Sequence, residues 1–183
     1  MMNSNELSDG VISRAAQSGI STLCNPPCGP EPTEQHAWLQ RFVGEWDAVI
    51  EMILDADEPP MTTRGREVAK MVGGFWLVSD AQNFDLPYTC RLTLGYDQIR
   101  AEYIGTWVDS MTDYLWHYRG HVDATGQVLT LETEGPFPPT PGETAKFREV
   151  TVFKSPDHRQ FTSARLQADG SWIRHLKIDF HRR

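Results

Sequence analysis

Short runs of β-branched and aromatic residues recur from residue 44 to the end of the chain, and turn residues separate them at close intervals. Clear turn signals are Gly73-Gly74, Asp123-Ala124-Thr125-Gly126 and Asp169-Gly170. Parallel neighbours need crossovers of about a dozen residues, so gaps this short predict antiparallel pairing. The runs number about ten, and a meander of that length closes because closure removes unpaired strand edges. The expected fold is all-β, an antiparallel meander closed into a roughly ten-stranded barrel.

A short amphipathic helix is expected just before the first strand. Thr33 is a candidate N-cap, because its hydroxyl can accept a backbone N–H of the first turn. Trp38 and Phe42 follow at helical spacing. Gly44 tolerates positive φ and is expected to end the helix, and a period-two pattern starts at Trp46. We therefore expect a helix that plugs one end of the barrel and leads into its first strand.

Residues 1–32 differ in composition from the rest of the chain. They are rich in Ser, Asn, Gly and Pro and carry few large apolar side chains. Such a segment cannot bury enough surface to offset the entropy lost on ordering. We expect a disordered or loosely docked extension over residues 1–32 and a single barrel domain over residues 33–183.

Several short motifs follow one another across residues 33–183. They are Gly44-Glu45-Trp46, Gly73-Gly74-Phe75-Trp76, Leu94-Gly95-Tyr96-Asp97, Gly105-Thr106-Trp107 with Ser110-Met111, Leu115-Trp116 with Tyr118, Glu134-Gly135-Pro136, and Phe180-His181-Arg182-Arg183. Together they resemble an uncharacterised bacterial family, domain of unknown function fifteen seventy-nine, which is placed among the calycin or lipocalin-like barrels. The resemblance implies the barrel fold and no known reaction. That family usually ends in a tyrosine, one residue and an arginine, and Phe180 replaces the tyrosine here.

The resemblance also implies a structural role for two residues. In calycins a basic residue near the final strand lies across the tryptophan that opens the first strand. We therefore expect Arg182 to lie over the indole of Trp46 and to close that end of the barrel. Such a cation–π contact is worth about 0.5–2 kcal/mol, depending on desolvation.

The charge of the chain argues against two classes of partner. The formal net charge is −8 and the basic residues are scattered, whereas nucleic acids and anionic membranes are bound by clustered lysine and arginine. No apolar run approaches the roughly 18 residues of a membrane helix, and the N-terminus lacks a signal-peptide pattern. We therefore expect no nucleic-acid or membrane partner and a cytoplasmic location.

The cysteines predict neither a disulfide framework nor a metal site. Cys24, Cys28 and Cys90 are an odd number, and two of them fall in the N-terminal extension. Cys24 and Cys28 could be combined with His36 as zinc ligands, but a fourth ligand is missing. We therefore expect no metal and no cofactor.

A ten-stranded barrel encloses more space than its side chains fill, which makes its interior, the lumen, the candidate site. Strand alternation places Tyr118 with Trp116, and Arg174 with Leu176 and Ile178, on the inward faces. The residues expected to bind a ligand are Trp107, Met111, Trp116, Tyr118, Arg148 and Arg174. Arginine can grip a carboxylate with two hydrogen bonds, and tryptophan and methionine suit a flexible apolar molecule. The alternatives are rim packing for Trp107 and Met111, and an ion pair between arginine and Glu132, Glu134 or Glu149.

These observations lead to a binding protein for a small, largely apolar molecule that carries a carboxylate or carbonyl group. One alternative is an isomerase or cyclase in which Tyr118 acts with Glu67 or Glu132, although no catalytic motif identifies such an enzyme. Another is haem binding through a final-strand histidine, as in nitrobindin-like barrels. His175 and His181 are the candidates, and both alternate with the residues expected to face inward. A lumen filled by tryptophans would leave only a structural role, and homodimerisation stays open.

Overall fold

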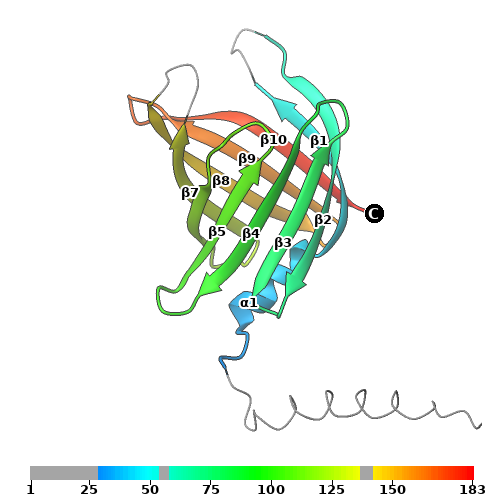
Figure 1. Ribbon diagram of the computed structural model, residues 1–183, viewed down its shortest axis with the longest axis vertical. Coiled ribbons are helices and arrows are strands. Elements are labelled where there is room, and N and C mark those ends of the chain that lie inside the picture. The colour runs from blue at the N-terminus through cyan, green and yellow to red at the C-terminus, as the bar shows by residue number, and fades with distance from the viewer. Residues whose placement is uncertain (1–28, 54–57, 137–141) are drawn as a thin grey trace, which may run out of the picture. The chain divides into compact units, whose positions relative to one another are not determined.

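The computed structural model describes residues 29–53, 58–136 and 142–183 (Figure 1). By its internal contacts the chain divides into two units, Met1–Glu31 and Pro32–Arg183. The second unit holds the helix and strands described below. The expectation of an extension over residues 1–32 falls mostly on residues outside the described ranges.

Ten strands form one closed antiparallel barrel, which confirms the predicted fold class. Each strand pairs with its neighbours in sequence, and the first pairs with the last, so the described sheet has no free edge (Figure 1). The strands are β1 (Gly44–Met52), β2 (Met61–Val72), β3 (Trp76–Asn83), β4 (Thr89–Asp97), β5 (Glu102–Asp109), β6 (Trp116–Val122), β7 (Val128–Pro136), β8 (Thr144–Ser155), β9 (His158–Leu166) and β10 (Trp172–Arg182).

A short helix lies at one end of the barrel, as predicted (Figure 1). It consists of α1 (Glu34–Trp38) and a 3₁₀ turn, η1 (Leu39–Phe42). Leu39 is fully buried, and the Trp38 indole donates a hydrogen bond of 2.9 Å to the carbonyl of Gly126 in the β6–β7 turn. The helix is therefore tied to the strands by apolar packing and by hydrogen bonds to a neighbouring turn.

The Gly44-Glu45-Trp46 motif has a direct structural reason. Gly44 has a φ of +126°, which favours glycine. A Cβ atom at this position would lie 2.6 Å from a guanidinium nitrogen of Arg182, so a side chain would collide with that residue. The glycine thus lets Arg182 approach the start of β1, where Trp46 is fully buried.

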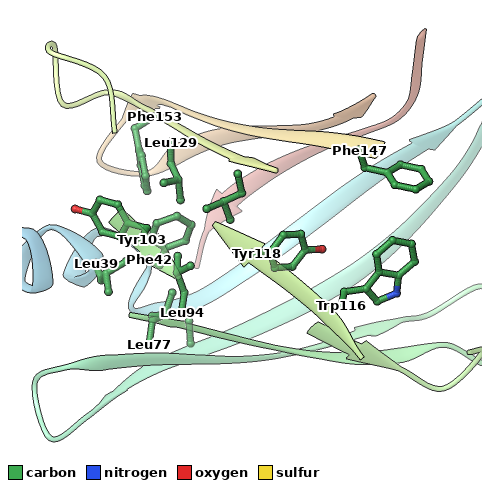
Figure 2. Packing of buried hydrophobic residues seen from close by; sticks show 12 residues of the cluster. Leu39, Phe42, Leu77, Leu94, Tyr103, Trp116, Tyr118, Leu129, Phe147 and Phe153 are labelled. Carbon is green, nitrogen blue, oxygen red and sulfur yellow. The ribbon is translucent and has the colours of Figure 1, made fainter. Parts of the chain in front are cut away.

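The main apolar core divides into two groups along the barrel (Figure 2). Leu39, Phe42 and Phe153 gather near the helix, and Trp116 and Phe147 lie towards the other end, the mouth. Tyr118 lies between these two groups (Figure 2).

A β-bulge changes the facing of residues in β10. The register between β10 and β9 shifts between Arg174 and Leu176. Leu176 and Ile178 face the lumen, whereas Arg174 is exposed. Because one additional residue reverses the alternation, the prediction that Arg174 shares the inward face with Leu176 is wrong.

Candidate functional site

The lumen contains a cavity of about 330 Å³ with a mostly apolar wall. This volume is at the lower end of the range of small-molecule sites, roughly 300–1,000 Å³. Apolar residues around it include Ile50, Met52, Leu92, Leu131, Phe161, Leu176 and Ile178. The prediction of interior space in a barrel of this size is therefore confirmed.

An ion pair lies at the helix end of the cavity. Arg159 of β9 donates a hydrogen bond to the carboxylate of Glu67 of β2, and both side chains are buried. The guanidinium also lies 3.8 Å from the ring centroid of Phe180 and 4.8 Å from that of Trp46. Burial lowers the pKa of Arg159, and the neighbouring carboxylate of Glu67 opposes this shift. The pair carries no net charge when both groups are ionised.

A second carboxyl group faces the middle of the cavity without such a cation. Glu149 of β8 lies on the cavity wall and is enclosed by protein. Burial raises its pKa from 4.5 to about 7, although hydrogen bonds from the hydroxyls of Tyr118 and Ser163 favour the ionised form. The distance between Ser163 Oγ and a carboxylate oxygen of Glu149 is 3.5 Å. This group can therefore exchange a proton near neutral pH.

Tyr88, Cys90 and Trp107 form a further polar cluster on the cavity wall. Cys90 has hydrogen bonds with both Tyr88 and Trp107. Burial is the main cause that raises the pKa of the Cys90 thiol and of the Tyr88 phenol, so both groups stay protonated at neutral pH. They offer hydrogen-bonding groups without adding a formal charge.

Aromatic residues narrow the lumen near its mouth. Trp116 packs edge-on against Phe147, with ring centroids 5.4 Å apart, and Gly135 leaves room for the indole. The rings of His175 of β10 and Phe147 also pack together, with centroids 5.7 Å apart. Burial lowers the pKa of His175. Trp116 therefore faces inward as predicted, as part of the core.

The predicted ligand-binding residues fall into two sets. Trp107 and Tyr118 line the cavity, and Trp116 is buried above it. Met111 is 70% exposed in the β5–β6 loop. Whether these four residues contact a ligand stays a prediction.

The two arginines of the prediction lie outside the lumen. Arg148 alternates with the inward residues Phe147 and Glu149, and it pairs with Glu132 at 2.9 Å. Its guanidinium also lies 4.2 Å from the ring centroid of Trp172. Arg148, like Arg174, therefore does not line the cavity, whose wall contains Arg159 instead.

Sequence reasoning did not select Arg159 or Glu149 as site residues. The sequence suggests Glu149 only as a partner for an arginine, although this residue alternates with Phe147, Thr151 and Phe153 along β8. That alternation places a carboxyl group among inward apolar residues, which is the signal that could have identified it. A similar signal exists for Arg159, which lies two residues before Phe161 on β9 and therefore shares its inward face.

The expected contact between Arg182 and Trp46 is present. The guanidinium of Arg182 lies 4.2 Å from the centroid of the indole. It also donates hydrogen bonds to the backbone carbonyls of Val43 and Arg41, at 2.5 and 3.1 Å. These bonds connect the end of β10 to the segment between the helix and β1.

The histidines do not fit an axial haem ligand in this cavity. His175 packs on Phe147 near the mouth, and His181 stacks on His158 with ring centroids 4.4 Å apart. Among the described residues, no histidine lines the cavity, and no group of three metal-ligating side chains is found. Cys24 and Cys28 of the zinc alternative lie outside those residues.

Within the described residues, no helix is long and apolar enough to cross a membrane.

Fold and site together define a calycin-like barrel with a mostly apolar cavity that contains a few enclosed polar groups. A family model described as "Protein of unknown function (DUF1579)" matches residues 31–182, and the chain belongs to this family. The resemblance drawn from the sequence motifs is thereby confirmed.

Comparison with solved structures gives matches at low sequence identity. The crystal structure of Rv2717c from M. tuberculosis matches with a TM-score of 0.59 and 14% identity, over 84% of this chain and 99% of that one. The S-type phycobiliprotein lyase CPES from Guillardia theta matches with a TM-score of 0.49 and 13% identity, over 80% of this chain and 91% of that one. Comparison with curated protein sequences gives no match.

Proposed function

We propose that the protein binds a small, largely apolar molecule in the lumen of the barrel, with one polar group of the ligand near Tyr118 and Glu149. The observation that carries the proposal is the cavity of about 330 Å³, whose apolar wall is interrupted by these groups. Apolar surface supplies most of the binding free energy in such a site, and a few polar groups fix the orientation.

The walls of the cavity support a preformed site. Backbone hydrogen bonds around the closed sheet hold the lining strands in fixed register. A ligand that enters such a site orders few protein groups, which lowers the entropic cost of binding.

The test uses a variant that fills the cavity. Ala81 of β3 lines the cavity, whereas Val68 of the adjacent strand β2 is exposed and does not line it. Binding of 1-octanol, measured by calorimetry and by tryptophan fluorescence, is expected to be lost in Ala81→Phe and kept in Val68→Phe. Equal binding by both variants would place the molecule outside the lumen and contradict the proposal.

A second candidate function is proton transfer within the same cavity. It is favoured by the hydrogen bond between Tyr118 and Glu149, together with the pKa of about 7 for Glu149. In this proposal the ionised carboxylate removes a proton from the carbon next to a ligand carbonyl, and the Tyr118 hydroxyl stabilises the developing oxyanion. The sequence suggested Glu67 or Glu132 as the acidic partner of Tyr118. This proposal uses Glu149 instead, because Glu132 lies on the exterior and Glu67 pairs with Arg159.

Deuterium exchange tests this candidate without knowledge of the natural substrate. We expect 2-octanone in D₂O to gain deuterium next to its carbonyl faster with the protein than without it. Glu149→Gln is expected to abolish the acceleration, and Tyr118→Phe to reduce it. An exchange rate equal to that of buffer alone would leave the barrel as a binding protein.

A further inference from the structure

The charges inside the lumen indicate which polar group a ligand carries. Among the described residues, the charged groups on the cavity wall are the Arg159–Glu67 pair near the helix, Glu149 in the middle, and Arg66. Arg66 alternates with the buried residues Gly65 and Glu67 along β2, and it pairs with Asp47 at 3.8 Å. Since Arg159 is already neutralised by Glu67, the carboxylate of Glu149 is left with hydroxyl partners only. A cation brought by a ligand would complete this arrangement.

The surroundings of Glu149 are consistent with this reading. Tyr118 and Ser163 contact the carboxyl group from β6 and β9. Across the cavity, Tyr88 and Cys90 are influenced by negative groups: Asp109 acts on both, and Glu149 on Tyr88. In addition to burial, these negative groups raise the pKa of Tyr88 and Cys90, and like charges of this kind oppose an anionic ligand.

The cations of the lumen lie at other levels. Arg159 is held by Glu67 and by aromatic rings at the helix end. Arg165 lies opposite Phe147, nearer the mouth, and the pKa of His175 is lowered there by burial and by the charge of Arg165. Neither is among the groups that act on Glu149. A carboxylate ligand would thus meet a like charge in the middle of the cavity.

We propose that the lumen takes small apolar amines, with the ligand ammonium hydrogen-bonded to the Glu149 carboxylate and its hydrocarbon part against the apolar wall. This inference rests on the proposed binding function and specifies the chemical class of its ligand. A charge-assisted hydrogen bond inside protein is stronger than one between neutral groups, because water does not compete for either partner. The ligand class replaces the carboxylate that Arg174 was expected to hold.

Three probes with the same hydrocarbon chain test the inference: octylamine, 1-octanol and octanoate. At pH 8 we expect octylamine to bind roughly tenfold tighter than octanol, and octanoate weaker than either, in calorimetric titrations. Glu149→Gln is expected to remove the preference for the amine while octanol binding remains. The matched control is Glu132→Gln on the exterior of the adjacent strand, which is expected to leave the preference unchanged.

Proton release gives a second readout on the unaltered protein. An ammonium stabilises the ionised form of Glu149, so octylamine binding near pH 6.5 is expected to release roughly three-quarters of a proton per ligand, and octanol none. Titrations in buffers of different ionisation enthalpy measure this release directly.

The outcomes separate the inference from the function on which it rests. Octanoate binding as tightly as octylamine, or an amine preference that survives in Glu149→Gln, would overturn the amine inference and leave a binding barrel. Failure of all three probes to bind would overturn the binding function as well.

Discussion

Two glutamates of the lumen, Glu67 and Glu149, differ in the groups that surround their carboxylates. Glu67 near the helix is neutralised by Arg159, and aromatic rings surround the pair. Glu149 in the middle has only hydroxyl partners, and its pKa is raised to about 7. The first arrangement closes the end of the barrel by packing and charge neutralisation. The second leaves a titratable group facing empty space, which is typical of a group kept for function.

Breaking the paired charge is expected to have the largest effect. Arg159→Met leaves Glu67 buried without its cation, and the loss of one partner of a buried pair costs about 3–5 kcal/mol. Urea unfolding followed by circular dichroism measures the free energy of unfolding. The double variant Glu67→Gln with Arg159→Met is expected to recover part of the loss. If the single variant loses less than the double variant, the pair does not stabilise this end.

Neutralising Glu149 is expected to stabilise the protein above neutral pH. The folded pKa of about 7 exceeds the value of 4.5 for an exposed glutamate. The folded state therefore holds a proton that the unfolded chain releases, so wild-type stability falls as pH rises between those values. Glu149→Gln lacks this loss and should gain up to about 3 kcal/mol relative to wild type at pH 8.

Urea unfolding at pH 5, 6.5 and 8 tests this pH dependence, with Glu132→Gln as the exterior control. The difference between Glu149→Gln and wild type should widen as pH rises. A constant difference over this range would show that Glu149 titrates near its ordinary pKa.

Removing the cation over Trp46 is expected to have a smaller effect at the closed end. Arg182→Ala loses a cation–π contact and hydrogen bonds to backbone carbonyls, at a cost of about 1–2 kcal/mol. Thermal unfolding measures the change, and octanol binding should persist because Arg182 does not line the cavity. A loss of octanol binding in a folded variant would link barrel closure to the site.

The exterior arginine is expected to matter least. Arg148→Ala removes a half-exposed ion pair with Glu132, which contributes about 0–1 kcal/mol. Octylamine and octanol should bind it as they bind the wild type, because the side chain lies outside the lumen. Weaker binding of either probe in calorimetry would restore Arg148 as a ligand-binding residue.

The sequence determined the architecture of this protein. Short β-rich runs with closely spaced turns left an antiparallel meander as the economical topology, and Gly44 with Trp46 located the start of the first strand. Local patterns specify such features because turn chemistry and side-chain alternation act over only a few residues. Tyr118 and Trp116 were placed on the inward face for the same reason.

The tertiary structure alone decided the charges of the lumen. A single bulge in β10 moved Arg174 outward, since one added residue reverses the alternation of a strand. The pairing of Arg159 with Glu67 joins residues 92 positions apart, and no local pattern specifies it. Whether a buried carboxyl is neutralised depends on what the closed barrel brings near it, and this separates Glu67 from Glu149.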